Sequence, residues 1–377
     1  MAGIYIHIPF CKHKCNYCNF FSVASVKYRD VFVASLLREM EMRKDYLKEA
    51  VVNTLYFGGG TPSLLTVDEI NTILSKADEL FNLNSDLEIT LEANPDDLSL
   101  EKVKSLKKET PINRFSIGVQ SFFDDDLQYL DRQHTAAQAK QAIENVQTAG
   151  FENITIDLIY GIPGLTPEKW NKNLDIFFSY RIPHLSSYSL TVEPKTALQH
   201  QIKKHKRAEV DEVLSIRHFE ILMEKIKQND FVHYEISNFA KQGFYSKHNS
   251  IYWLGDHYLG LGPSAHSFNG VSRQWNVALL KKYIDSDVVE KMVAEKEVLT
   301  TEQLFNEYIM TSLRTSWGCD SEHINNVFGA EYANYFTKNI KPFLSEGKVD
   351  RYGNRYILTN HGKLFADGIA MELMRVS

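Results

Sequence analysis

Three cysteines lie close together near the N-terminus, at Cys11, Cys15 and Cys18. Three thiolates on one short loop can ligate three irons of a cubane iron–sulfur cluster and leave the fourth iron open. The alternative is a structural zinc site with His7 or His13 as the fourth ligand. Structural zinc sites are usually built from two separated ligand pairs, so the compact triplet favours an iron–sulfur cluster.

Composition and charge narrow the class of protein. The chain has 377 residues, with 42 Lys and Arg against 48 Asp and Glu, and its net charge of −6 argues against a general polyanion binder. Only Cys319 lies outside the triplet, and so few cysteines in so long a chain exclude a secreted disulfide scaffold. The N-terminus has no basic segment before an apolar one, and no apolar run reaches the ~18 residues of a membrane span. We therefore expect a cytoplasmic protein.

Short β-rich runs and amphipathic helical patterns alternate through the first half of the chain. The expected strands are Gly3–Pro9, Val51–Phe57, Leu87–Ala93, Arg114–Val119, Asn153–Ile159 and His184–Leu190. The expected helices between them are Lys27–Lys48, Thr66–Phe81, Ser99–Lys107, Thr135–Ala149 and Thr166–Tyr180. This alternation predicts an α/β fold, a partial (β/α)6 TIM-like barrel with right-handed crossovers. In such barrels the chemistry gathers at the C-terminal ends of the strands.

Two further regions follow the barrel. We divide the chain into a barrel core at 1–230, an extension at 231–296 and a C-terminal domain at 297–377. The last domain is expected to contain helices, a hairpin at Val349–Thr359 and a final helix at His361–Met374, a pattern that resembles a winged helix. Basic and acidic residues are nearly balanced there, so we expect no nucleic-acid binding.

Glycine and polar residues stand at the ends of successive expected strands. The run Gly58–Thr61 follows the second strand, and Glu92 and Gln120 lie at the ends of the third and fourth. Asp157 lies in an apolar run of the fifth strand, where a carboxylate needs a partner or a ligand. The alternatives are a simple tight turn for the glycines and an internal salt bridge for Asp157. Their recurrence at one end of the barrel favours a shared ligand site.

The C-x3-C-x2-C motif after a first strand resembles the motif of radical S-adenosylmethionine (SAM) proteins, and the strand-end residues follow it in order. The resemblance implies a 4Fe-4S cluster on Cys11, Cys15 and Cys18, with SAM on the open iron and an electron donor for the cluster. It also implies that Tyr17 packs near the adenine of SAM. The remaining SAM contacts that it implies are Tyr5, Gly59, Gly60, Thr61, Glu92, Gln120, Arg132 and Asp157.

Longer motifs are similar to those of the oxygen-independent coproporphyrinogen III oxidase family. They comprise Tyr5–Cys11, Gly58–Pro62, Glu92–Pro95 and Gly118–Phe122. That family contains decarboxylases of porphyrinogen propionates and a branch of heme chaperones. The decarboxylases carry one more cysteine, two residues after the third ligand, where this chain has Phe20.

A second motif also favours the heme-chaperone branch. His248–Trp253 matches the H-N-x-x-Y-W pattern of that branch, which implies heme bound with His248 as an axial ligand. His257 and His266 are candidates for a second axial ligand. The alternative reading of His248 is a hydrogen-bonded structural residue.

The resemblance therefore implies a heme chaperone that binds heme and delivers it to an acceptor protein, without a catalytic residue of its own. Membrane contact is expected only through a partner. The alternative function is an oxygen-independent coproporphyrinogen III oxidase, an oxidative decarboxylase that would use the radical SAM chemistry. A third possibility is a zinc protein with a winged-helix interaction module.

Overall fold

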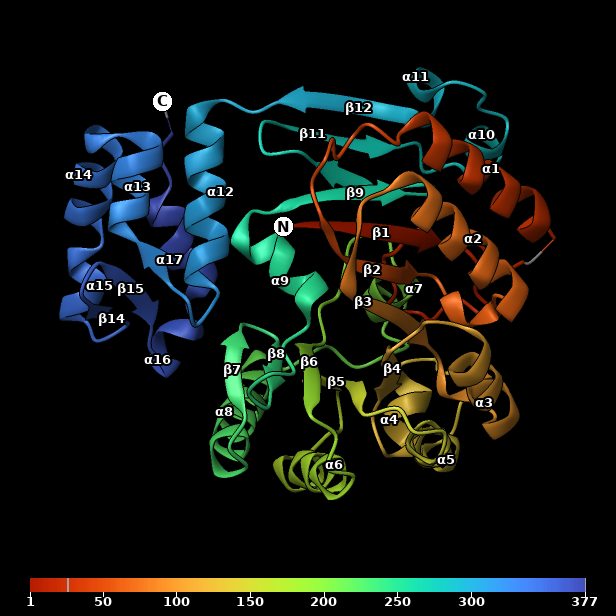
Figure 1. Ribbon diagram of the computed structural model, residues 1–377. Coiled ribbons are helices and arrows are strands. Elements are labelled where there is room, and N and C mark those ends of the chain that lie inside the picture. The colour runs from red at the N-terminus through yellow and green to blue at the C-terminus, as the bar shows by residue number, and fades with distance from the viewer. Residues whose placement is uncertain (26, 377) are drawn as a thin grey trace.

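The computed structural model describes residues 1–25 and 27–376, and its centre is a curved sheet in which six parallel strands follow one another in chain order (Figure 1). The full sheet has twelve strands in the order β12-β11-β10-β9-β1-β2-β3-β4-β5-β6-β8-β7. The six parallel strands are β1 Ala2–Ile8, β2 Val52–Gly59, β3 Leu83–Ala93, β4 Arg114–Gln120, β5 Asn153–Tyr160 and β6 His184–Ser189. Each lies at a position where the sequence predicts a strand.

Helices cover the outer face of these strands. They are α1 Arg29–Met42, α2 Val67–Leu80, α3 Leu100–Glu109, α4 Asp124–Tyr129, α5 Ala136–Thr148 and α6 Pro167–Ser179. Thr66 and Thr135 begin α2 and α5 with capping boxes, in which the threonine side chain and a residue one turn later bond each other's backbone N–H groups. Helix α1 is shorter than expected, and the short helix α4 was not predicted.

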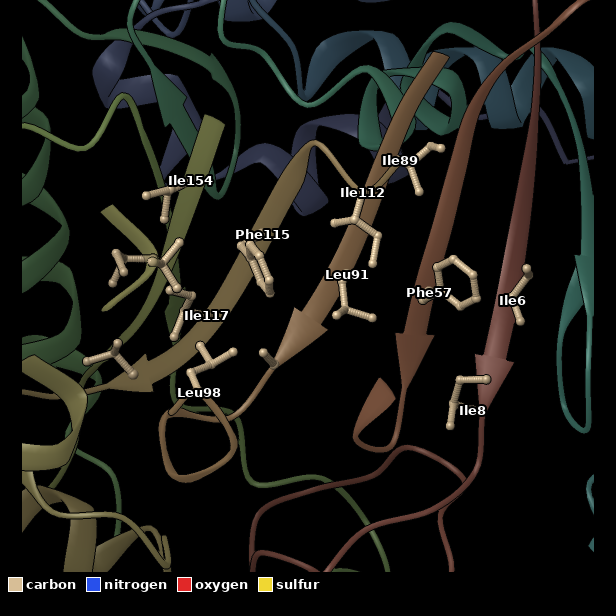
Figure 2. Packing of buried hydrophobic residues seen from close by; sticks show 14 of the residues in the cluster. Ile6, Ile8, Phe57, Ile89, Leu91, Leu98, Ile112, Phe115, Ile117 and Ile154 are labelled. Atoms are coloured by element: carbon tan, nitrogen blue, oxygen red, sulfur yellow. The ribbon is translucent and has the colours of Figure 1, made fainter. Parts of the chain in front are cut away.

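The core lies between the strands and these helices (Figure 2). Ile6 and Ile8 on β1, Leu91 on β3, and Phe115 and Ile117 on β4 are all buried. Because side chains alternate along a strand, the intervening residues point to the other face, the inside of the barrel. Many of those inward residues are polar, so the apolar core and the polar interior are separated by the sheet itself.

Two groups of strands extend the sheet beyond the barrel. One edge is formed by β7 Val232–Glu235 and β8 Asn238–Ala240, and the other by β9 His257–Leu261, β10 His266–Phe268, β11 Ser272–Asn276 and β12 Val293–Val298. The helices of this part are α7 Ala197–Lys203, α8 Glu212–Gln228, α9 Lys247–Leu254, α10 Leu280–Ile284 and α11 Val289–Met292. Strand β9 pairs in parallel with β1, so the predicted extension shares its sheet with the barrel.

The C-terminal part packs around a hydrophobic cluster of its own, which includes Phe305, Phe336 and Leu358. Its helices are α12 Thr301–Leu313, α13 Ser321–Phe328, α14 Ala330–Asn339, α15 Lys341–Ser345, α16 Asn360–Lys363 and α17 Ala366–Leu373. Its strands are β13 Cys319–Asp320, β14 Val349–Tyr352 and β15 Arg355–Leu358. Helix α12 follows β12 and runs beside the barrel sheet, as Figure 1 shows.

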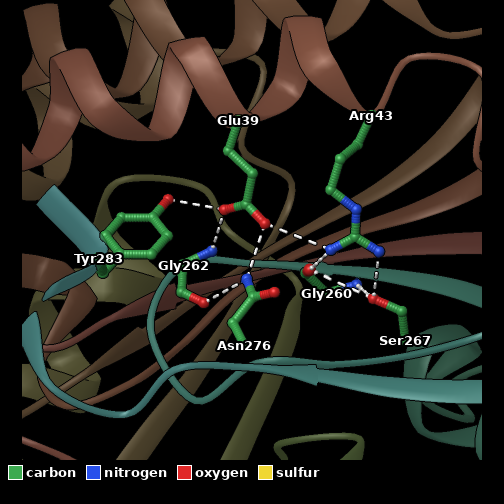
Figure 3. Close-up of polar contacts among 7 residues, drawn as sticks. All are labelled: Glu39, Arg43, Gly260, Gly262, Ser267, Asn276 and Tyr283. Carbon is green, nitrogen blue, oxygen red and sulfur yellow. Dashed lines mark hydrogen bonds and ion pairs between the residues drawn. The ribbon is translucent and has the colours of Figure 1, made fainter. Parts of the chain in front are cut away.

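A buried carboxylate fastens the strand extension to α1 (Figure 3). Glu39 accepts hydrogen bonds from the Gly262 N–H at 2.8 Å, the Asn276 amide at 2.7 Å and the Tyr283 hydroxyl at 2.6 Å. It also pairs with Arg43, whose guanidinium donates to the Gly260 carbonyl. Both charged side chains are almost fully buried, so the charge of each is stabilised by the opposite charge of the other.

We expect Glu39→Ala to lower the free energy of unfolding by about 3–5 kcal/mol, because it leaves the Arg43 cation buried without a counter-charge. Glu41→Ala is the matched control, since Glu41 lies on the same helix but is exposed. Urea unfolding of both variants measures the difference. Equal urea midpoints for the two variants would show that the Glu39 carboxylate does not stabilise the contact between α1 and the strand extension.

Candidate functional site

A pocket of about 490 Å³ opens at the C-terminal ends of the parallel strands. It collects residues from the cysteine loop and from the ends of β2 to β6, which are far apart in the sequence. The residues predicted as SAM contacts that line it are Tyr17, Gly59, Gly60, Thr61, Glu92, Gln120, Arg132 and Asp157. Tyr5 does not line the pocket, and its hydroxyl lies 3.2 Å from Nδ1 of His7.

The cysteine loop follows β1 and is held against the glycine turn after β2. Gly60 N–H donates to the Ile8 carbonyl at 2.8 Å, and Thr61 N–H donates to the Phe10 carbonyl at 2.7 Å. A Cβ atom on Gly60 would lie 2.6 Å from the Phe10 carbonyl oxygen and 3.1 Å from Sγ of Cys11. The close approach of these two loops therefore requires glycine at position 60.

All three cysteines are free thiols, and Cys11 is buried while Cys15 and Cys18 are partly exposed. This donor set fits three corners of an iron–sulfur cluster with one side open to the pocket, which Cys18 lines. Within residues 1–25 and 27–376, no three His, Cys, Asp or Glu side chains are already gathered around a single ion position.

The two histidines that a zinc site would use as a fourth ligand are engaged elsewhere. Nε2 of His7 bonds the Phe21 carbonyl at 2.9 Å, and its Nδ1 lies near the Tyr5 hydroxyl. Nε2 of His13 lies 2.9 Å from the carboxylate of Asp131. Both ring nitrogens of His7 are therefore occupied in this conformation, which argues against His7 as the fourth ligand of a zinc site.

Arg132 places a cation between the cysteine loop and the strand ends. Its guanidinium donates to Sγ of Cys15 at 3.6 Å, to Oδ1 of Asn94 at 2.7 Å and to the Gly118 carbonyl at 2.8 Å. Because three partners fix its guanidinium at the pocket, Arg132 is positioned to bind an anionic group there.

Two carboxylates also line the pocket. Glu92 accepts hydrogen bonds from the Tyr56 hydroxyl at 2.7 Å and from Gly59 N–H at 3.1 Å, and burial raises its pKa to about 7. Asp157 accepts a hydrogen bond from Ser116 at 3.3 Å, and burial raises its pKa to about 6. Asp157 forms no salt bridge with any of the described residues. The alternative role, an ion pair inside the barrel, is therefore not seen.

The end of β4 is strained where it meets the pocket. Gln120 has a φ of 68°, a left-handed conformation that few residues other than glycine adopt. Such a conformation costs on the order of 1–3 kcal/mol and is held by its surroundings, often at a ligand site. Tyr56, Ser116 and Tyr188 also belong to the site and were missed, although the inward alternation of β2, β4 and β6 would have indicated them.

Comparisons with known proteins agree with this geometry. The Radical SAM superfamily model matches residues 5–176, and the HemN C-terminal domain model matches residues 299–365. The heme chaperone HemW of Bacillus subtilis is 34% identical over 98% of this chain and 98% of its own length. That of Mycobacterium tuberculosis H37Rv is 31% identical over 99% of this chain and 94% of its own. The chain belongs to the HemW family of radical SAM proteins.

A solved structure has the same fold. Coproporphyrinogen III oxidase (HemN) from Escherichia coli superposes with a TM-score of 0.85 at 24% identity, covering 99% of this chain and 90% of the other. The predicted α/β fold, a parallel sheet of the radical SAM type with a small C-terminal domain, is thereby confirmed. No helix within the described residues is long and apolar enough to cross a membrane.

His248 lies in the barrel interior near the starts of β1 and β2, and Tyr56, whose hydroxyl bonds Glu92, lies between it and the pocket. It is 1% exposed, with Nδ1 at 2.8 Å from the Thr54 hydroxyl and Nε2 at 2.9 Å from the Tyr252 hydroxyl. Its ring stacks on Tyr56 at 4.8 Å, and burial lowers its pKa to about 3. The sequence left two roles open for His248, an axial heme ligand and a hydrogen-bonded structural residue. In this conformation both ring nitrogens are hydrogen-bonded, so heme ligation requires one of them to leave its hydroxyl partner.

The raised pKa of Glu92 predicts a pH effect on stability. The folded protein disfavours its ionisation, so the wild type loses stability as the pH rises from the ordinary value of 4.5 through about 7. Glu92→Gln cannot ionise and avoids this loss. We expect the stability of the variant, relative to the wild type without added SAM, to increase between pH 5 and pH 8 in thermal unfolding. A difference that stays constant with pH would contradict the assignment.

Proposed function

We propose that this protein is a heme chaperone, which binds heme and delivers it to an acceptor protein. The observation that carries this proposal is similarity along almost the whole chain to proteins named heme chaperones. Phe20 supports it, because this ring lines the pocket with 69% of its surface exposed at the position where the decarboxylases have a further cysteine. A phenyl ring has no acidic hydrogen and no metal-binding atom, so it cannot replace a thiol in the chemistry.

The pocket supports a 4Fe-4S cluster on Cys11, Cys15 and Cys18 with SAM beside it. A bound cluster supplies an open iron for SAM and, when an electron donor reduces it, an electron. Glu92 suits the cationic amino group of SAM because its carboxylate faces the pocket from beside Gly59. Arg132 suits the carboxylate of SAM because its fork already lies at the cysteine loop.

We expect Cys15→Ala to lose iron and acid-labile sulfide after anaerobic reconstitution, because a cluster corner is lost. Cys319→Ala is the matched control, since this thiol is buried in the C-terminal part, away from the pocket. Elemental analysis of both variants gives the answer. Stoichiometric zinc without iron or sulfide in the wild type would contradict the cluster.

The alternative function is oxidative decarboxylation of coproporphyrinogen III, and one assay separates it from heme carriage. We expect the reconstituted protein to leave coproporphyrinogen III unchanged under anaerobic conditions with SAM and a reductant, and to bind hemin in an absorbance titration. Phe20→Cys is the informative companion variant, since it restores only the missing thiol. Stoichiometric vinyl product from the wild type would overturn the chaperone proposal.

Heme ligation by His248 remains a prediction of the motif. It requires one of the two hydroxyls that bond its nitrogens, that of Thr54 or that of Tyr252, to be displaced so that the freed nitrogen can reach the iron. That displacement costs a hydrogen bond in the barrel interior.

A further inference from the structure

A groove of about 610 Å³ lies between the mouth of the barrel and the start of helix α17. On the barrel side it is lined by the ends of β5 and β6 and by the first turns of α8, and on the other side by residues 363–368. Tyr188, Ser189 and Thr191 line both this groove and the SAM pocket. The two cavities are therefore neighbours that share one wall.

The groove presents apolar and aromatic side chains to solvent. Tyr188, Ile216 and Phe365 are 43%, 46% and 45% exposed. Behind them, Tyr160 and Phe219 stack at 6.1 Å with an angle of 23° between their rings. Large apolar side chains gathered in a concavity are typical of a ligand site, and the volume lies in the range of about 300–1,000 Å³ found for small-molecule pockets.

One cation in this groove has no counter-charge. Lys363 is partly buried, and its Nζ donates to Nδ1 of His233 at 3.0 Å. His233 is neutral, since burial holds its pKa well below the ordinary value, and its Nε2 faces the Ile236 carbonyl. Within the described part of the chain no carboxylate pairs with Lys363, whereas the nearby Asp367 is paired with Arg314.

The charge on Lys363 persists at neutral pH, because burial lowers its pKa only to about 8. An ammonium has three donors, and His233 uses one of them. A partly buried ammonium with free donors is stabilised by an anionic oxygen. The groove thus combines flat apolar walls with a single site for a carboxylate.

We propose that this groove binds a carboxylate-bearing tetrapyrrole, with its ring against the aromatic wall and one propionate on Lys363. The identification of that tetrapyrrole as heme rests on the proposed function. The bound ring would lie beside the SAM pocket, because Tyr188 separates the two cavities. This placement needs no movement of His248.

Gly368 allows a test by size. It lines the groove from α17, and a Cβ atom there would meet nothing within 4 Å. We expect Gly368→Trp to fill the groove and weaken hemin binding by at least about tenfold, whereas Gly368→Ala keeps the wild-type affinity. Glu372→Trp, an exposed position of the same helix outside the groove, is the control for bulk. Hemin is titrated by its absorbance, and circular dichroism verifies that each variant is folded.

The charge is tested separately. We expect Lys363→Met to weaken binding of hemin and coproporphyrin III, which both carry propionates, and to leave a porphyrin dimethyl ester unaffected. Lys338→Met, an exposed lysine of α14, is the control. Comparison of hemin with metal-free protoporphyrin IX shows whether the iron adds affinity. Equal losses for the ester and the free acids would overturn the ion pair with Lys363.

The outcomes separate the two proposals. If the wild type binds no hemin, both the chaperone proposal and the groove as a heme site fail. If the wild type binds hemin and Gly368→Trp binds it equally well, the groove is overturned and the chaperone proposal stands. Loss of binding in His248→Ala, with Gly368→Trp unaffected, would also overturn the groove and would support ligation by His248.

Discussion

The interior of the barrel is polar, so the polar side chains that point inward need hydrogen-bond partners. The fully buried Arg114 donates to Thr155, and His184 lies between Thr155 and the Tyr234 hydroxyl. A buried polar group without a partner costs roughly 2–7 kcal/mol, so these bonds offset much of the cost of burying polar side chains inside the barrel. Glu92 and Asp157 lie at the open end of the barrel, where burial raises their pKa values. A cationic group of a ligand can pair with them there.

Local patterns were enough to predict the alternating strands and helices. Apolar side chains repeat every second residue in β1 and every third or fourth in α2, and Thr66 caps that helix. Side chains at the strand ends could be predicted as one site because parallel strands end on the same side. By contrast, α4 has only 6 residues, which is too short for a helical periodicity to be detected in the sequence.

The position of His248 could not be predicted, because it depends on contacts that are remote in sequence. Thr54 lies 194 residues before it, and the motif alone does not show that α9 folds back beneath β2. The contacts of Glu39 with Asn276 and Tyr283 are equally remote in sequence, and they help to hold the strands that follow α9 to α1. The groove at Lys363 is likewise made by two parts of the chain that meet only in the folded protein.

We propose that this radical SAM fold carries a tetrapyrrole and does not decarboxylate it. The most direct measurement is to follow hemin and coproporphyrinogen III together in one anaerobic reaction with reconstituted protein, SAM and a reductant. We expect stoichiometric bound hemin that passes to an apo hemoprotein, with coproporphyrinogen III recovered intact. Conversion of coproporphyrinogen III to a vinyl product, with hemin left unbound, would contradict it.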